Sequence, residues 1–250
     1  MIEERRRQLA QRLVEEGRLV VRELAGEFGV TTETIRKDIA YLESLGIAKK
    51  ARGGATYIND RREIPYHETS TLHTHEKSAI ARLAVSLIPG NVIMLDGGST
   101  NLAIAKLLSL QDGLTVITNS VSIIPVLGNA HGVELILTGG KIRAISQDMV
   151  GFWASRALQE VMADVCFIGA NSLSHEGGPS TSTMAEVELK RTMLHSARQK
   201  YVVADSSKLH VISTYRYVEW GEIDGLITDS AIDPQFVRSI SSFTNVYQTD

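Results

Sequence analysis

The sequence has little cysteine, little proline and no long hydrophobic run, and these shortages exclude several classes of protein. Its 250 residues include five prolines and one cysteine, Cys166. A single cysteine excludes an intramolecular disulfide and a multi-cysteine zinc site. Cys166 lies in an apolar run, where a buried and inert thiol is expected. No apolar run approaches the length of a membrane span, and the charged residues 3–7 do not resemble a signal peptide. We therefore expect a cytoplasmic protein with one large domain or two smaller ones.

Negative charge is in slight excess, but it is distributed unevenly along the chain. The formal net charge is −3 for the whole sequence. Residues 1–56 contain eleven basic and nine acidic residues, a formal charge of +2, which leaves −5 for residues 57–250. DNA meets a local surface rather than the average charge of a chain. The amino-terminal part is therefore compatible with DNA binding.

Three helices are predicted in that part, over residues 3–16, 20–28 and 32–44. A helix-turn-helix needs a small residue where its helices cross, a residue tolerant of positive φ in the turn, and an apolar residue under the second helix. Ala25, Gly29 and Ile35 meet these needs at suitable spacing. Residues 47–56 are predicted to form a basic hairpin, or wing. A packing unit without a ligand is the alternative, but the polar and basic outward residues favour DNA. The predicted DNA contacts are Thr32, Glu33, Thr34, Arg36, Lys37, Lys49 and Arg52.

Residues 30–39, 42–46 and 52–55 together resemble the DeoR family of bacterial transcriptional regulators. Their sequences are Val-Thr-Thr-Glu-Thr-Ile-Arg-Lys-Asp-Ile, Leu-Glu-Ser-Leu-Gly and Arg-Gly-Gly-Ala. That family pairs an amino-terminal winged helix-turn-helix with a sugar-phosphate-sensing domain, and the resemblance continues through most of the chain. With the polar, irregular residues 57–75 taken as a linker, it implies a DNA-binding domain at 1–56 and an effector-sensing domain at 76–250.

From residue 76 on, strand-like apolar runs alternate with helical segments. The predicted strands are residues 92–95, 114–118, 133–137, 165–168, 201–204 and 225–228, the last of the chain. The predicted helices are residues 77–88, 102–110, 120–127, 154–162, 184–198 and 234–240. This alternation predicts an α/β fold with a mostly parallel, Rossmann-like sheet covered by helices. Such sheets bind ligands at the carboxyl ends of their strands.

The first of these strands leads into a candidate anion-binding loop, Asp96-Gly97-Gly98-Ser99-Thr100. Ser99 or Thr100 is the expected N-cap of the following helix, whose start presents free N–H groups. The two glycines let backbone amides approach a ligand closely. Free amides and the helix dipole favour an anion, most simply a phosphate. An ordinary strand-to-helix turn is the alternative. Polar residues and glycines at the ends of the other strands favour the phosphate.

In DeoR-type sensors this region resembles the phosphate loop of ribose-5-phosphate isomerase, which implies that Gly97, Gly98, Ser99 and Thr100 hold the phosphate. Lys77, Arg143 and Lys190 are further candidate cations, although a surface pair between Glu186 and Lys190 is an alternative role for Lys190. The predicted effector-binding residues are Lys77, Asp96, Gly97, Gly98, Ser99, Thr100, Thr118, Asn119, Gly139, Gly140, Arg143, Asn171, Lys190, Asp205 and Lys208.

The resemblance implies a regulator, most simply a repressor of a sugar-catabolic operon that leaves its operator when a phosphorylated sugar binds. The implied partners are operator double-stranded DNA, the phosphorylated sugar and further copies of the chain in a dimer or tetramer, with no membrane. No catalytic residue, cofactor or metal is predicted. The rival is a sugar-phosphate isomerase-like enzyme fused to a DNA-binding domain. Isomerisation needs a base, and Asn171 stands where the isomerase has an acid-rich turn. A purely architectural DNA-binding protein does not account for a large domain with polar strand ends.

Overall fold

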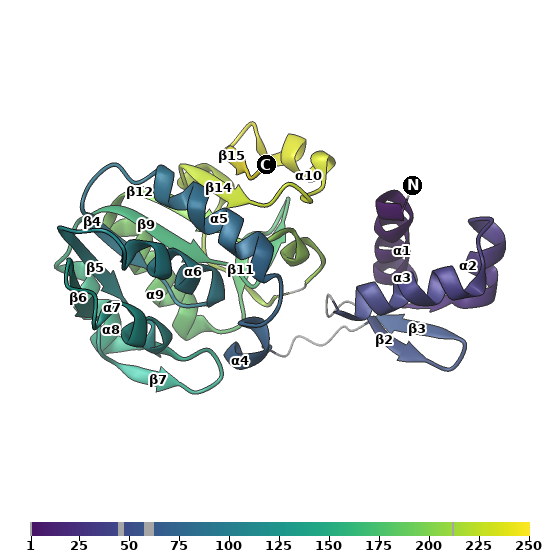
Figure 1. Cartoon of the computed structure of the whole chain (residues 1–250), viewed down its shortest axis with the longest axis horizontal. Helices are drawn as coiled ribbons and strands as arrows, with labels where there is room; N and C mark the ends of the chain where they lie inside the picture. The colour runs from purple at the N-terminus through teal and green to yellow at the C-terminus, as the bar shows by residue number, and fades with distance from the viewer. Residues whose placement is uncertain (1, 45–47, 58–62, 212) are drawn as a thin grey trace. The chain divides into compact units, whose positions relative to one another are not determined.

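The chain divides into two compact units, which are described separately below. The computed structural model describes residues 2–44, 48–57, 63–211 and 213–250 (Figure 1). One unit comprises residues 1–61 with residues 210–212, and the other comprises residues 62–209 and 213–250. No helix in the described ranges has the length and apolarity that crossing a membrane requires.

The amino-terminal unit is a winged helix-turn-helix. Its helices are α1 (Ile2–Glu16), α2 (Val21–Glu27) and α3 (Thr32–Ser44). Its strands β1 (Arg18–Val20), β2 (Ala48–Ala51) and β3 (Gly54–Tyr57) form an antiparallel sheet in the order β1-β3-β2. Leu13, Leu24 and Ile39 are among the buried side chains that hold the helices together.

The helix-turn-helix spacing has the geometry that the sequence predicts. Ala25 and Ile35 are buried, and Gly29 has a φ of 62° in the turn. The predicted start of the second helix at residue 20 is wrong. Residues 18–20 form strand β1, whose partner β3 lies more than thirty residues away in the sequence. The first residue of the predicted wing, residue 47, lies outside the described residues.

The large unit is built on a seven-stranded sheet with the order β15-β14-β12-β9-β4-β5-β6, in which every neighbouring pair is parallel. The strands are β4 (Val92–Leu95), β5 (Leu114–Thr118), β6 (Val133–Leu137), β9 (Ala163–Gly169), β12 (Ala197–Val203), β14 (Gly225–Thr228) and β15 (Asn245–Gln248). This arrangement confirms the predicted mostly parallel sheet. The prediction that residues 225–228 form the last strand is wrong, because β15 follows.

Helices cover both faces of the sheet (Figure 1). On one face lie α5 (Thr74–Ser86), α6 (Ser99–Leu108), the short 3-10 helix η1 (Val121–Ile123) and α7 (Ile124–Leu127). On the other lie α8 (Phe152–Gln159), α9 (Met184–His195) and α10 (Pro234–Ile240). The central strands β4 and β9 are buried on both faces, which is why their sequences are nearly continuously apolar.

Several short elements depart from the sequence prediction. Predicted loops contain the hairpin β7 (Lys141–Arg143) and β8 (Asp148–Val150), the antiparallel strands β10 (Ser172–Ser174), β11 (Gly178–Thr181) and β13 (Tyr215–Arg216), and the 3-10 helices η2 (Ser206–His210) and η3 (Trp220–Glu222). The segment predicted as a linker contains α4 (Tyr66–Thr69) and the first turn of α5. Helix α9 ends at His195, so the expected helix over residues 184–198 is too long. Elements this short carry little periodicity, and long-range contacts decide them.

Candidate functional site

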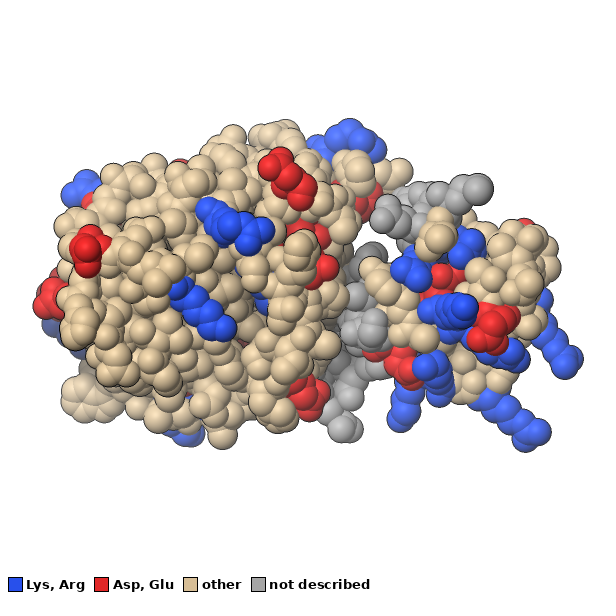
Figure 2. Space-filling model, viewed as in Figure 1, with Lys and Arg blue, Asp and Glu red and all other residues tan. Residues whose placement is uncertain are grey.

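A polar and basic surface lies at the start of α3 and on the wing. Thr32, Glu33, Arg36, Lys37, Lys49 and Arg52 are all exposed, and Thr34 is half-buried. Thr31 caps the helix, since its Oγ1 accepts a hydrogen bond of 3.1 Å from the Thr34 amide. Figure 2 shows Lys and Arg side chains gathered on this unit. The start of the second helix of a helix-turn-helix is the part that meets base edges in the major groove.

Three other basic residues of this unit, none of them a predicted DNA contact, pair with its own carboxylates. Asp38, on α3, is buried and accepts hydrogen bonds from Arg5 Nε at 2.6 Å and Arg6 Nε at 2.9 Å, both on α1. The wing is tied to α3 as well, because the Lys50 ammonium lies 2.6 Å from Glu43. The sequence contains no local sign of the α1 pairing, since its partners are more than thirty residues apart.

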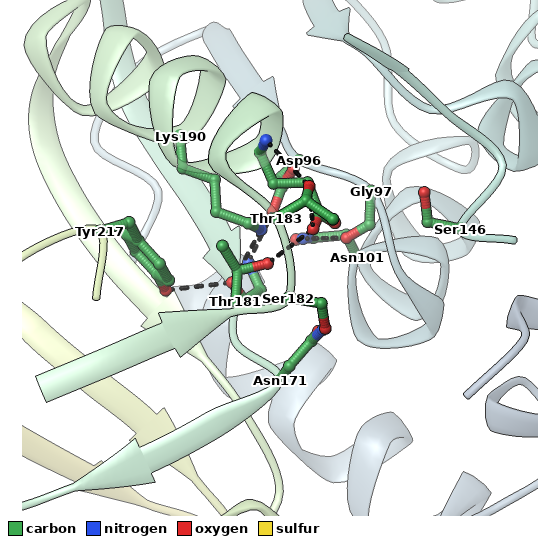
Figure 3. Close-up of polar contacts among 12 residues, drawn as sticks. Asp96, Gly97, Asn101, Ser146, Asn171, Thr181, Ser182, Thr183, Lys190 and Tyr217 are labelled. Carbon is green, nitrogen blue, oxygen red and sulfur yellow. Dashed lines mark hydrogen bonds and ion pairs between the residues drawn. The ribbon is translucent and has the colours of Figure 1, made fainter. Parts of the chain in front are cut away.

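The predicted anion loop forms the turn between β4 and α6. Helix α6 begins at Ser99, and its N-cap is Gly98 with a φ of 98°. The predicted N-cap at Ser99 or Thr100 is therefore wrong by one or two residues. The first-turn amides of residues 99–101 have no partner within the helix, which leaves the positive end of α6 able to receive an anion. Asn101 braces the loop by donating 3.1 Å from Nδ2 to the Gly97 carbonyl (Figure 3).

A buried ion pair between Asp96 and Lys190 lies directly beneath this loop. Asp96 also accepts from the Gly169 amide at 3.0 Å, while Lys190 Nζ donates to the Gly169 carbonyl at 3.0 Å. Tyr217 donates to the same carbonyl at 3.0 Å (Figure 3). Burial opposes the charge of Lys190, but the carboxylates of Asp96 and Glu186 outweigh it and raise the lysine's pKa. The alternative of a surface pair with Glu186 is wrong, since both side chains are buried.

A second group of predicted residues lies on the side of the loop where α5 and η2 begin. Lys77 Nζ donates to the carbonyls of Thr69 and Leu72, each at 2.6 Å, and the side chain is buried. Burial lowers the pKa of Lys77 to about 8, although the Asp205 carboxylate opposes this. Burial alone would raise the pKa of Asp205, but Lys208 and the Ser207 hydroxyl lower it. Ser99 Oγ contacts the Thr69 carbonyl at 3.4 Å, which links this group to the loop.

Arg143 lies on the opposite side of the loop, where β7 and α9 meet. Its guanidinium pairs with Glu63, with one contact of 3.0 Å, and with Glu186 at 2.9 Å. Glu186 also accepts hydrogen bonds of 3.0 Å from the hydroxyls of Thr181 and Thr183. The predicted cation is therefore present, but two carboxylates already neutralise it.

The other predicted strand-end residues are largely engaged with the protein itself. Asn171 donates a hydrogen bond of 2.7 Å from Nδ2 to Ser182 Oγ. An amide side chain does not act as a base. Thr118 Oγ1 accepts from the Ser120 amide at 3.1 Å. Gly139 and Gly140 turn the chain after β6 with φ values of 66° and 117°. Nearby, the buried Asn119 Oδ1 has no hydrogen-bond partner in the described chain.

Asp148 is a buried carboxyl of the site that the sequence analysis missed. It begins β8, and its Oδ1 has no hydrogen-bond partner among the described residues. Burial, with the nearby Asp96 carboxylate, raises the pKa of Asp148 to about 8. The sequence offered one sign of this residue, an acidic side chain directly before the apolar pair Met149-Val150. That stretch was predicted to be a loop.

Comparison with known proteins identifies the family of this chain. The family model described as the DeoR C terminal sensor domain matches residues 72–230, more than half of the chain. The chain belongs to the DeoR family. The DeoR-like helix-turn-helix domain matches residues 5–61. This DeoR-family chain is therefore a DNA-binding transcriptional regulator with a sensor domain.

Relatives named as transcriptional regulators match this DeoR-family chain over most of their length. The putative aga operon transcriptional repressor of Escherichia coli O157:H7 is 38% identical over 92% of this chain and 87% of its own. The lactose phosphotransferase system repressor of Lactococcus lactis subsp. lactis is 29% identical over 94% of each chain. These names agree with the prediction of a regulator rather than an enzyme.

Among solved structures, ribose 5-phosphate isomerase A of Methanocaldococcus jannaschii aligns with 53% of this chain and 53% of its own, at 20% identity and a TM-score of 0.39. A TM-score this low does not establish a shared fold. The sheet topology of the sensor unit is given by its own strand pairing.

Proposed function

We propose that this regulator is a cytoplasmic repressor of an operon for sugar or sugar-derivative catabolism, and that a phosphorylated sugar releases it from its operator. The observation that carries the effector proposal is the loop at the start of α6, whose first-turn amides lie at the same sheet edge as buried polar atoms, such as Asn119 Oδ1 and Asp205 Oδ2, that have no hydrogen-bond partner among the described residues. A buried polar group without a partner is unfavourable, so a polar ligand that supplies the missing contacts is expected to bind there. The names of the relatives above support the choice of a sugar operon.

The charges around the loop suit a phosphate at the start of α6. Lys77 and Lys208 supply positive charge near Ser99 and Asp205. Helix N-termini bind phosphate through free amides and the helix dipole, and a cation strengthens this through charge-assisted hydrogen bonds. Lys190 contributes less, because Asp96 already neutralises it.

Residues 63–72 form a candidate path from this site to the DNA-binding domain, which they follow directly in the sequence. Glu63 pairs with Arg143 at one end of the segment, and the Tyr66 amide donates to the Ile145 carbonyl at 2.7 Å. At the other end the Thr69 carbonyl accepts from both Lys77 and Ser99. A phosphate at the loop would compete with this segment for Lys77, Ser99 and Arg143. Effector binding would thereby alter the conformation of residues 63–72.

Release also requires that the effector favour one state of an oligomer. We propose a dimer or tetramer whose recognition helices meet repeated operator half-sites, about 34 Å apart or a multiple of this. An effector that weakens operator binding must itself be weakened by operator DNA to the same extent. A footprint with one unrepeated site would contradict this arrangement.

The effector proposal is tested by thermal denaturation with phosphorylated and unphosphorylated sugars. A ligand of the folded state raises the melting temperature by mass action. We expect a rise confined to phosphorylated compounds, and a smaller rise for Lys208→Ala because one phosphate-side cation is lost. Lys208→Ala should still bind operator DNA but resist release. If no phosphorylated sugar shifts wild type while operator DNA still binds, the regulator stands without this effector.

The transmission path is tested with Glu63→Gln, which keeps the side chain's shape and removes its charge. Arg143 is then freer to bind the effector, so affinity should rise by about tenfold, or 1.4 kcal/mol. Operator affinity without effector should fall, since the segment is released beforehand. Glu68→Gln is the matched control, because Glu68 lies exposed on α4 of the same segment. Unchanged effector and operator affinities in Glu63→Gln would contradict the path.

A further inference from the structure

Asp148 occupies the space that Gly97 leaves open in the anion loop. A Cβ added to Gly97 would overlap the Asp148 carboxylate, and Gly97 has no positive φ that would itself require glycine. The Met149 amide donates to the Asn119 carbonyl at 2.7 Å, which fixes β8 beside the end of β5. The carboxyl of Asp148 is thus held against the backbone of the proposed phosphate loop, with 7% of the residue exposed.

Titratable side chains from four neighbouring parts of the fold interact with Asp148. Asp96 follows β4, and Glu186 and Lys190 lie on α9. Arg143, on β7, and Tyr66, on α4, also interact with Asp148 electrostatically, and Ser146 hydrogen-bonds to it. Lys190 and Arg143 are committed to ion pairs with Asp96, Glu63 and Glu186. The three carboxylates of Asp96, Glu63 and Glu186 therefore outnumber the two cations of this cluster. The excess makes this side of the loop electronegative.

The buried atoms without partners on this side are all oxygens. They are Oδ1 of Asp148 on β8, Oδ1 of Asn119 after β5, and Oδ1 of Asn101 on α6. Amide and carboxylate oxygens accept hydrogen bonds. A buried acceptor left without a donor destabilises the folded protein. The protein supplies no donor to these atoms in its described part, so a ligand is their natural source.

We propose that Asp148 is a specificity-determining residue of the effector site, which accepts a hydrogen bond from a donor group on the carbon skeleton of the phosphorylated ligand. The inference rests on the proposed function and extends it. The phosphate lies at the start of α6, toward Lys77 and Lys208. The donor group lies toward Asp148, on the electronegative side of Gly97. A hydroxyl and an ammonium group both supply this chemistry, and the test separates them.

The test measures binding by isothermal titration to wild type, Asp148→Asn and Asp148→Ser. The probes are glucose 6-phosphate, glucosamine 6-phosphate and 2-deoxyglucose 6-phosphate, the galactose counterparts, and inorganic phosphate. In wild type we expect a donor-bearing sugar to bind about tenfold more tightly than its deoxy analogue, which is about 1.4 kcal/mol. Asp148→Ser should lose most of that preference, and Asp148→Asn should lose part of it because its amide oxygen still accepts a hydrogen bond. Both variants should keep their affinity for inorganic phosphate. Asp112→Asn, exposed on the surface, is the control and should keep the preference.

The outcomes separate the two sources of the donor. A loss in Asp148→Asn that is much larger for glucosamine 6-phosphate than for glucose 6-phosphate indicates an ammonium, because only the carboxylate offers it an ion pair. Equal losses indicate a hydroxyl. Variants that keep the wild-type preference overturn the inference and leave the proposed function standing. If no phosphorylated sugar binds wild type, both fail.

The stability of Asp148→Asn has its own readout, which does not depend on ligand binding. The pKa of Asp148 is raised from 3.8 to about 8, so its stabilising contribution is complete below pH 4 and is lost as pH rises through about 8. Asn does not titrate. The melting temperature of Asp148→Asn relative to wild type should therefore increase between pH 5 and pH 8 and level off above it. A difference independent of pH would contradict the raised pKa of Asp148.

Discussion

Replacing Lys190 with methionine is expected to destabilise the large unit by about 3–5 kcal/mol, because it leaves the charge of Asp96 buried without its partner. Methionine retains much of the lysine's apolar length, so lost packing contributes little. Asp96 would keep only the Gly169 amide as a donor in the described site. Urea unfolding followed by tryptophan fluorescence measures this directly. Both tryptophans of the sequence, Trp153 and Trp220, lie in the large unit and report on it alone.

Two further variants separate the charge effect from packing. Lys106→Met removes an exposed lysine from α6 and should change stability very little. The double variant Asp96→Asn with Lys190→Met removes both charges and should recover a large part of the loss. If the double variant is as unstable as Lys190→Met, the ion pair is not the cause.

Replacing Arg36 with alanine is expected to weaken operator binding by about 1–3 kcal/mol, roughly 5- to 150-fold, if this side chain reaches a base edge. Its side chain is 62% exposed near the start of α3, and its ion pair with Glu33 at 3.3 Å is a weak surface contact that DNA can replace. The operator is first selected from random DNA with wild-type protein. Fluorescence anisotropy then gives the affinities at a fixed salt concentration, because phosphate contacts make binding depend strongly on salt.

Arg156→Ala is the matched control for this measurement. Arg156 also lies exposed on a helix in a surface pair, with Glu160 at 2.7 Å, but it belongs to the sensor unit. It should leave operator affinity unchanged, and both variants should keep the thermal shift caused by the effector. Equal loss of operator affinity in the two variants would indicate a general charge effect. Unchanged affinity in Arg36→Ala would remove Arg36 from the interface.

Features with local signals were predictable from the sequence. Helix α3 and strand β4 have their predicted bounds, since apolar periodicity and flanking turn residues specify them. The turn at Gly29 was predicted because a positive φ has a characteristic residue preference. The strand–glycine–helix loop was recognisable for the same reason, although the helix begins slightly earlier than predicted. Alternating strands and helices also sufficed for the parallel sheet.

Partnerships between distant residues were decided only by the tertiary structure. Lys190 was predicted as a ligand's cation, yet Asp96, 94 residues away in the sequence, neutralises it. Asp148 carries little local signal, because its importance comes from burial against Gly97 and from an Oδ1 that has no hydrogen-bond partner among the described residues. Strand β1 likewise exists only because β3 pairs with it. The sequence by itself determined most of the longer helices and strands and the strand–glycine–helix turn, because those depend on neighbouring residues. The tertiary structure alone decided which charges are already paired, because burial and ion pairing depend on residues that only folding brings together.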